Sequence, residues 1–399
     1  MPVYYAGLNA SPLFSNQDGI VTSISHFTQI PFPGITDIEI GWNYFLLWQD
    51  TKLYITGKIS EKDDRNRPHL MQIPEESGSC ELAAPGRDSV VVLSTRNEIW
   101  KYKIYDDSWQ KVTPFIPSND NMQIEHAIKL SQAGCTVVLT NLGRVFNAPL
   151  LVEMPKRVKF VDLACGFDHT ILLAENGDVY SMGMGMYVTY ANMFLLSLCY
   201  LINEIIIIIH NGRRGQLGHN DLENCDNPKL IEALAGLKVM QISAGGWHTA
   251  VVTDQGDLYT WGWNSNGELG IESKDKKVHA VPTLVDFKND SGENIEINVK
   301  KVECGNSFTI CLTGKINLLH TDAKILIKVV FPRRKMTFVF SSDDGFFWGC
   351  GSNKYGQLGK LQWNLENSYN FVKLDIQSLD PKTVKKFKCR EWGTAIITE

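Results

Sequence analysis

The feature that most constrains this 399-residue sequence is an internal repeat. The best-preserved copy, residues 240–270, reads MQISAGGWHTAVVTDQGDLYTWGWNSNGELG, and a second copy, residues 160–183, reads FVDLACGFDHTILLAENGDVYSMG. A third copy is divided between residues 301–313 and 344–359. Weaker copies occupy residues 38–57, 82–102 and 130–146. A single unit of this kind cannot bury its apolar face alone, so neighbouring units must complete its core.

Each copy predicts β structure. In the best copy, the apolar run 250–252 precedes a turn with glycine at residues 254–256, and a second run follows at residues 258–261. Two short runs rich in β-branched and aromatic residues, joined by such a turn, are typical of a β-hairpin. Val, Tyr, Trp and Thr suit the half-buried surface of a sheet.

The two ends of the chain together make one further copy. Residues 387–399, FKCREWGTAIITE, stop where the hairpin turn is expected, and residues 3–14, VYYAGLNASPLF, resemble the missing half. This copy brings the count to seven and predicts that residues 3–6 pair with residues 394–398. A repeat shared between the termini indicates a closed ring, because closure removes the exposed sheet edges. We therefore expect an all-β fold, a seven-bladed β-propeller, as one domain over residues 1–399.

The motif Ala-Gly-Gly-Trp-His-Thr, followed by Asp-Gln-Gly-Asp-Leu-Tyr-Thr-Trp-Gly-Trp-Asn, resembles the regulator of chromosome condensation repeat. The resemblance implies a seven-bladed propeller of four-stranded blades, closed by the N- and C-terminal strands. The founding member of that family has a basic N-terminal tail, whereas residues 1–19 here contain no Lys or Arg. DNA binding through a tail is therefore not carried over. Nor does the sequence show a clear equivalent of the founder's residues for nucleotide exchange on Ran.

Two segments, residues 186–210 and 314–340, interrupt the repeat pattern. The first is long and apolar enough for a transmembrane helix, but Glu204 within it would be costly in a bilayer. A functional loop is a second reading, since propellers display loops for binding. The third reading, which we favour, is translated intron sequence, because the repeat is intact before each segment and resumes after it.

The sequence offers no catalytic, cofactor or metal motif. His169 and His248 occupy the same repeat position, and we expect each to form hydrogen bonds between strands within its own blade. The nine Cys show no CxxC spacing, and the three that share one repeat position, Cys165, Cys304 and Cys389, are interpreted as small buried side chains in strands. The residues expected to build the repeat are Gly166, His169, Gly245, Trp247, His248, Trp261, Gly262, Gly305, Trp348 and Gly349. Trp247 and Trp261 are expected in the blade core or at blade contacts.

Binding is expected in loops, because loops on a rigid ring carry function while strand residues carry packing. The loops around residues 219–227 and 265–277 are the first candidates, and their candidate partner-binding residues are His219, Asp221, Glu223, Asn264, Asn266, Lys274 and Lys276. The net charge is −5 and no segment is strongly basic, so we expect no direct nucleic-acid binding. Clusters such as Arg213–Arg214 are interpreted as solvated surface.

These observations predict a non-enzymatic platform for protein–protein interaction, with no cofactor and no membrane association. The resemblance implies a setting in chromatin and chromosome segregation, in the nucleus, on chromosomes and in the cytoplasm. It also implies a protein partner such as a Jumonji-type histone demethylase or hydroxylase, or histones. The alternative is a guanine-nucleotide exchange factor for a small GTPase, as the family's founder is.

Overall fold

The computed structural model describes most of the chain. The described residues are 1–9, 14, 22–58, 64–74, 77–112, 125–132, 134–183, 214–273, 276–289, 291–314, 345–359, 366–374, 376, 379 and 383–399. The two interruptions of the repeat, 186–210 and 314–340, lie outside these ranges except for Gly314, and so does Lys274.

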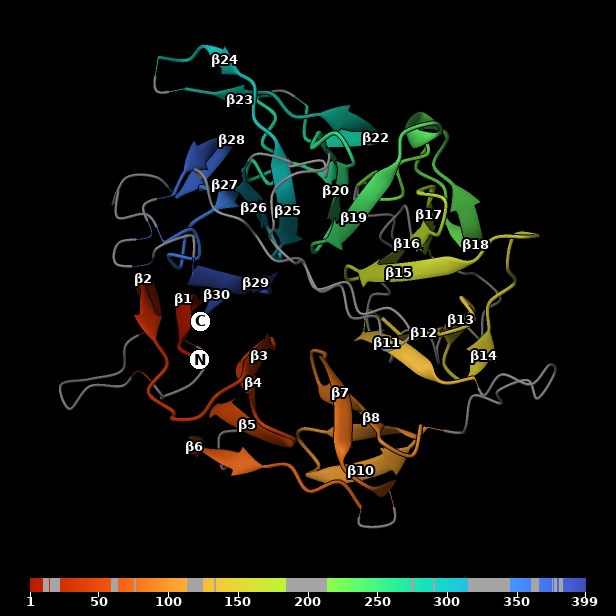
Figure 1. Ribbon diagram of the computed structural model, residues 1–399, viewed down its shortest axis with the longest axis vertical. Coiled ribbons are helices and arrows are strands. Elements are labelled where there is room, and N and C mark those ends of the chain that lie inside the picture. Colours follow the sequence, from red (N-terminus) through yellow and green to blue (C-terminus); the bar gives the residue numbers. More distant parts are fainter. Residues whose placement is uncertain are drawn as a thin grey trace, which may run out of the picture.

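The described strands form seven four-stranded antiparallel sheets, arranged as blades around a central axis (Figure 1). The first four blades along the chain are β3–β6 (Asp37–Ile40, Tyr44–Gln49, Lys52–Lys58, Asp64–Leu70), β7–β10 (Cys80–Pro85, Ser89–Ser94, Ile99–Lys103, Ser108–Lys111), β11–β14 (Ala127–Gln132, Thr136–Thr140, Val145–Asn147, Leu150–Leu151) and β15–β18 (Phe160–Cys165, His169–Ala174, Val179–Gly183, Cys225–Leu230). The chain is therefore the predicted seven-bladed β-propeller.

The remaining blades complete the ring. They are β19–β22 (Val239–Ala244, His248–Thr253, Leu258–Trp263, Val278–Leu284), β25–β28 (Val299–Cys304, Phe308–Thr313, Phe347–Ser352, Asn367–Lys373) and the closing blade, β29 and β30 (Val384–Arg390, Gly393–Thr398) with β1 and β2 (Val3–Leu8, Ser23–Gln29). A short hairpin, β23 (Phe287–Lys288) and β24 (Asn294–Ile295), projects outside the ring (Figure 1). A 3₁₀ turn, η3, spans Glu232–Leu234.

The two termini share the closing blade, as the sequence predicted. β1 pairs antiparallel with β30 in the register Val3↔Ile397, Tyr4↔Ile396 and Tyr5↔Ala395. The closing blade also contacts the first blade through Lys388, whose ammonium lies 2.7 Å from Asp37 Oδ1 and 2.5 Å from Glu39 Oε1. The two carboxylates raise the pKa of Lys388 despite its burial. Hydrogen-bonded strands and half-buried ion pairs thus join the first and last segments of the chain.

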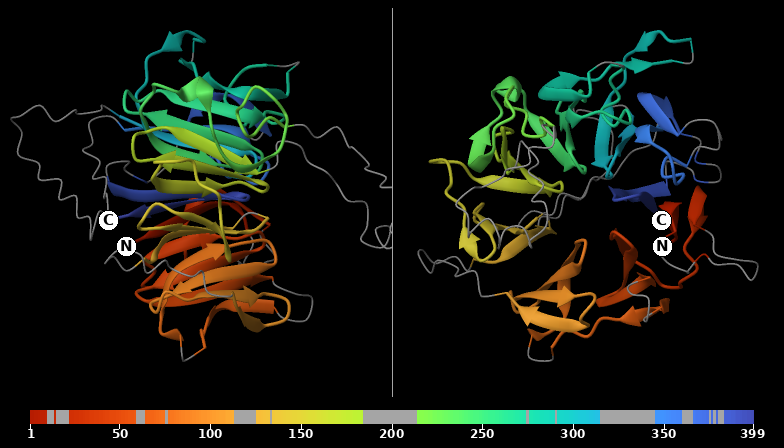
Figure 2. Two further views of the ribbon diagram at one scale, coloured as in Figure 1. Left: turned by 90° about the vertical axis from the view of Figure 1, so that its right-hand side faces the viewer. Right: turned by 180° about the vertical axis from the view of Figure 1, so that it is seen from behind.

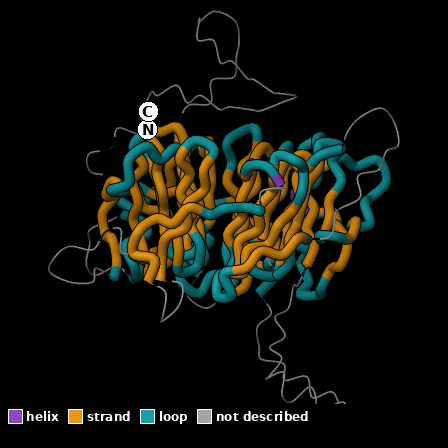
Figure 3. Tube along the Cα trace, turned by 90° about the horizontal axis from the view of Figure 1, so that it is seen from below, coloured by secondary structure: helices purple, strands orange, loops and turns teal. Residues whose placement is uncertain are grey.

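The apolar core lies between adjacent blades. Four second strands, β16, β20, β26 and β30, are buried along their whole length. Each is covered on both faces by the neighbouring blades. One cluster joins Ile171 of β16 to Val251 of β20 and Trp261 of β21, and so spans two blades. Seen from the side, the blades stack into a ring with the loops collected at its two faces (Figures 2 and 3). Within the described ranges, no helix is long and apolar enough to cross a bilayer.

Candidate functional site: the axial face

One face of the ring gathers a loop from every blade around the axis. In each blade the innermost strand ends on this face, and the loop to the second strand turns beside the axis; Figure 1 shows β3, β7, β11, β15, β19, β25 and β29 nearest the centre. Side chains and backbone of these loops line a cavity of about 530 Å³, to which all seven blades contribute. We call this surface the axial face; it includes the loops around residues 41–43, 86–88, 134–135, 166–168, 245–247, 305–307 and 390–392.

Backbone hydrogen bonds connect five of these loops in series. Gly134 N donates to Phe167 O at 2.9 Å, and Phe167 N donates to Gly246 O at 3.1 Å. The series continues from Gly246 N to Asn306 O at 3.0 Å and from Asn306 N to Glu391 O at 2.8 Å. Because each loop is held by its neighbour, side chains on the axial face project from a pre-organised backbone.

Arg390 connects the end of this series to two further blades. Its Nη2 donates to Pro85 O at 3.0 Å and to Gln132 O at 3.1 Å, which belong to the blades β7–β10 and β11–β14. One side chain of the closing blade thus contacts two blades that are not its neighbours in the ring. A guanidinium suits this position because its planar fork of N–H groups can serve several carbonyls at once.

Five half-buried aromatic rings run across the axial face. Tyr355 lies 5.9 Å from Trp392, Trp392 lies 5.4 Å from Trp42, Trp42 lies 6.0 Å from Phe167, and Phe167 lies 5.0 Å from Trp247, all measured between ring centroids. Most of these contacts are edge-to-face, which the quadrupoles of the rings favour. The series draws on five blades, so it exists only when the ring is closed.

Guanidinium groups cover two of the rings. Arg87, which is exposed, lies 5.1 Å from the Trp42 centroid. Arg214 lies 3.5 Å from the centroid of Trp247 and 5.1 Å from that of Trp263. Cation–π contacts at such distances are favourable. Arg87 keeps its side chain in water, whereas Nε and Nη1 of Arg214 are buried.

Trp247 was expected in the blade core or at a blade contact. Its ring is half-buried and lines the axial cavity, and it contacts Phe167 of the neighbouring blade. The reason is its position in the loop after β19, one residue before the strand that carries the core. Burial raises the pKa of the neighbouring Asp168, and the Trp247 indole N–H and Arg214 partly offset this rise. Trp261, by contrast, is fully buried and donates from Nε1 to Gln216 O at 2.9 Å.

His169 and His248 are buried, but their partners lie in the next blade and not in their own. His169 Nε2 lies 3.0 Å from Thr249 Oγ1, and His248 Nε2 lies 2.9 Å from Thr309 Oγ1. The expectation of a bridge within one blade was therefore wrong, because the ring places the imidazole against the adjacent second strand. Thr309 in turn donates to Glu268 O at 2.7 Å. Burial lowers the pKa of His169 to about 4 and that of His248 to about 3, the charge of His169 adding to the second shift.

Only glycine fits beside these two histidines, because the imidazole ring and a backbone carbonyl lie too close for a Cβ atom. A Cβ on Gly245 would lie 2.2 Å from His248 Cε1 and 2.4 Å from Gly305 O, and one on Gly166 would meet His169 in the same way. Gly262 adopts a φ of +108°, with the Trp247 carbonyl directly beside its Cα. Trp348 is buried in β27, with Gly349 next to it. The glycine and the histidine three residues after it thus recur in the repeat because both take part in contacts between blades.

The loops predicted to bind partners lie on the same face as the axial loops but further out, because the third strand of each blade ends there. His219 is half-buried against Ser181 Oγ at 2.9 Å, and Asp221 pairs with Lys229 at 3.5 Å. Glu223 and Lys276 are exposed, and Asn266 is half-buried. Asn264 is not available to a partner: it is 1% exposed and bonds Ile271 O and Leu269 N within its own loop.

Sequence reasoning missed most of the axial face. Trp42, Arg87, Arg390, Glu391 and Trp392 were not selected. A signal for them existed, since each lies at the end of the first strand or between the first and second strand, at the positions equivalent to Gly-Gly-Trp-His of the best copy. Alignment of the seven copies would have grouped these positions on one face. The weak copies concealed Trp42 and Arg87, because they keep a glycine there (Gly41, Gly86) but have lost the histidine landmark.

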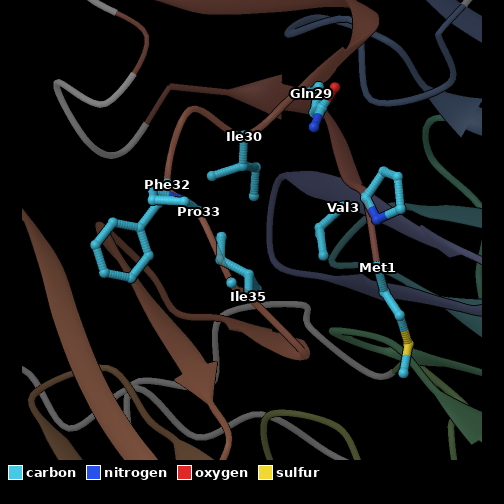
Figure 4. A pocket seen from close by; sticks show the side chains of 9 residues that line it. Met1, Val3, Gln29, Ile30, Phe32, Pro33 and Ile35 are labelled. Atoms are coloured by element: carbon cyan, nitrogen blue, oxygen red, sulfur yellow. The ribbon is translucent and has the colours of Figure 1, made fainter.

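A second, smaller cavity of about 260 Å³ lies beside the closing blade (Figure 4). Its lining is mainly apolar and includes Met1, Val3, Ile30, Phe32 and Ile35. Among the residues that the structure describes, no group of three or more His, Cys, Asp or Glu is arranged to hold a metal ion. The axial face is therefore the better-built candidate site, because it combines aromatic, cationic and unpaired acceptor groups.

A seven-bladed ring with linked axial loops defines this chain as a β-propeller built to present one face. Comparison with known families gives the particular class. Residues 211–252 and 255–312 match the family model "Regulator of chromosome condensation (RCC1) repeat", and a second model of the same description matches residues 160–185 and 239–268. The matched residues of this chain carry RCC1 repeats.

Relatives support this assignment. RCC1 domain-containing protein 1 from Homo sapiens is 28% identical over 299 residues, which cover 72% of this chain and 68% of the human protein. Its counterpart in Mus musculus is 31% identical over 223 residues, 54% of this chain and 48% of that protein. Among solved structures, Prp20p from Saccharomyces cerevisiae shares the fold with a TM-score of 0.66 at 14% identity, covering 99% of this chain and 90% of that one.

Proposed function

We propose that this propeller is a non-catalytic platform for protein–protein interaction and that the axial face is its contact surface. The observation that carries the proposal is the series of half-buried rings Tyr355, Trp392, Trp42, Phe167 and Trp247, flanked by arginines on a hydrogen-bonded backbone. Trp, Tyr and Arg are the residues most enriched among those that dominate binding energy. A rigid backbone under them reduces the entropy lost on association.

We propose further that the partner is a chromatin protein. The solved Prp20p structure is described together with the binding of that protein to Gsp1p and histones, and the relatives above carry the same repeat. A histone, or a Jumonji-type histone demethylase or hydroxylase, is the partner class we propose for this chain, acting in the nucleus and on chromosomes. Identification of the bound partners tests this setting, because one fold can host many functions.

The test is affinity capture from nuclear extract with matched charge reversals. Arg87→Glu alters the axial face at an exposed side chain. Arg96→Glu is the control: it is also exposed and lies in the same blade, but in the turn between β8 and β9 at the other face. We expect Arg87→Glu to lose the captured chromatin proteins and Arg96→Glu to retain them, with equal melting temperatures. Equal capture by both variants would refute the axial face as the contact surface.

A further inference from the structure

Three residues that line the axial cavity each carry a buried acceptor atom without a donor. Asn306 is 5% exposed, and among the residues that the structure describes its Oδ1 receives no hydrogen bond. The same holds for Oε2 of Glu391, whose side chain is 11% exposed, and for Oε1 of Gln132. All three residues line the cavity of about 530 Å³. Since buried polar atoms in folded proteins nearly always have partners, a group that donates hydrogen bonds fits this cavity.

The cation already present there does not satisfy these atoms. Arg390 donates from Nη2 to the carbonyls of Pro85 and Gln132, and its Nε lies 3.9 Å from Glu391 Oε1, which leaves Oε2 unserved. The lining is nearly balanced in charge, with three cationic side chains, Arg87, Lys101 and Arg390, and three carboxylates, Asp88, Asp168 and Glu391. Recognition would therefore come from the position of the unpaired acceptors and not from net charge.

The walls of the cavity are suited to a cation. Trp42, Phe167 and Trp247 line it with their rings, and aromatic faces attract ammonium and guanidinium groups. The chain already makes such contacts itself, with Arg87 over Trp42 and Arg214 over Trp247. Hydrogen bonds from a cation to a carboxylate are stronger than neutral ones, and Arg and Lys carry five and three N–H donors respectively.

We propose that the axial cavity binds an arginine or lysine side chain presented by a protein partner. The cavity volume falls within the range of about 300–1,000 Å³ that is usual for ligand pockets. Glu391 Oε2 and Asn306 Oδ1 would accept hydrogen bonds from the bound cation, and the rings of Trp42 and Trp247 would flank it. This inference rests on the proposed function, because it assigns a ligand chemistry to the same face.

The test uses the full-length protein and short synthetic peptides. The peptide acetyl-Gly-Ser-Gly-Arg-Gly-Ser-Gly-amide is compared with versions that carry lysine, citrulline or norleucine in place of arginine. Binding is followed by tryptophan fluorescence, since Trp42 and Trp247 line the cavity. We expect saturable binding of the arginine and lysine peptides and roughly tenfold weaker binding of the citrulline peptide, because citrulline keeps the shape and three N–H donors of arginine but lacks the charge. The norleucine peptide should not bind.

Two variants and one control locate the binding. Glu391→Gln should weaken the arginine peptide by roughly tenfold, and Asn306→Asp should strengthen it, because the first removes a carboxylate and the second adds one. Glu296→Gln, at an exposed residue after β24, should leave the affinity unchanged. Melting curves establish that each variant is folded; if Glu391→Gln does not fold, Asn306→Asp carries the test.

Equal binding of all four peptides, absence of binding by any of them, or an affinity that neither variant changes would overturn the inference. These outcomes are distinct from failure of the proposed function. If chromatin proteins are still lost from Arg87→Glu while no peptide binds the wild-type protein, the axial face binds partners without a basic side chain in the cavity. If capture is unaffected by Arg87→Glu, the proposed function fails independently of the peptide result.

Discussion

The stability of the ring should depend on pH through His169 and His248, and His248→Gln should reduce that dependence. Both imidazoles are buried, with pKa values of about 4 and about 3 in the folded protein. In the unfolded chain a histidine has a pKa of about 6.5. Thr309 donates its hydroxyl hydrogen to Glu268 O, so His248 Nε2 must donate to Thr309 Oγ1, and a second proton would lie on a buried nitrogen.

The direction and size of this pH dependence follow from proton linkage. Because each folded-state pKa lies below the unfolded value, the unfolded chain binds more protons below pH 6.5, and the free energy of unfolding falls as the pH falls. Between pH 6.5 and 5.0 this loss is about 1.5 kcal/mol for each histidine. Burial also raises the pKa of Glu268, to about 7, and this group acts in the opposite direction over the same interval. A comparison of two variants at each pH cancels the contribution of Glu268.

The measurement is urea denaturation of the wild-type protein and His248→Gln at pH 8.0, 6.5 and 5.0. Glutamine can still donate to Thr309 but does not titrate. His248→Gln should therefore be destabilised by roughly 1–2 kcal/mol at pH 8.0. The difference should shrink by about 2 kcal/mol between pH 8.0 and pH 5.0, because only the wild type loses the contribution of His248 as the pH falls. A difference that stays constant from pH 8.0 to 5.0 would refute the assignment of a buried neutral imidazole between blades.

Four further predictions concern the ring and its activity. Deletion of residues 1–9 should lower the melting temperature, because β1 then no longer pairs with β30, and an unchanged value would contradict closure. Trp261→Ala should cost about 3–5 kcal/mol, while the half-buried Trp247→Ala should cost less, as denaturant melts will show. Excision of residues 186–210 and 314–340, which lie outside the described residues except for Gly314, should preserve strand content by circular dichroism; unfolding would show that these segments are structural. Labelled GDP should leave Ran at the uncatalysed rate, and acceleration by orders of magnitude would favour the alternative of an exchange factor.

The fold followed from the sequence because the repeat encodes contacts that recur. Gly245 and His248 recur at the positions of Gly166 and His169, and each pair meets the neighbouring blade in the same way. The closure by β1 and β30 could also be predicted, since the two incomplete copies at the termini fit one unit.

The site was harder to predict because it depends on side chains that do not recur. Arg390 reaches Pro85 and Gln132 across the ring, over sequence separations that no local pattern records. Trp42 contacts Phe167 and Trp392 only because three different blades bring their loops to the axis. Trp247 was assigned to the blade core or a blade contact since large aromatic residues usually pack there, but its place in a loop decided its exposure.

Hydrogen–deuterium exchange on the complex recovered from nuclear extract tests the central claim most directly. Exchange is compared in the free and bound protein for the axial loops, residues 86–88, 245–247 and 390–392, and for the turns at the other face, residues 95–97 and 254–256. We predict that binding slows exchange at the axial loops and leaves the opposite turns unchanged. Protection confined to those opposite turns, or spread equally over both faces, would contradict the account.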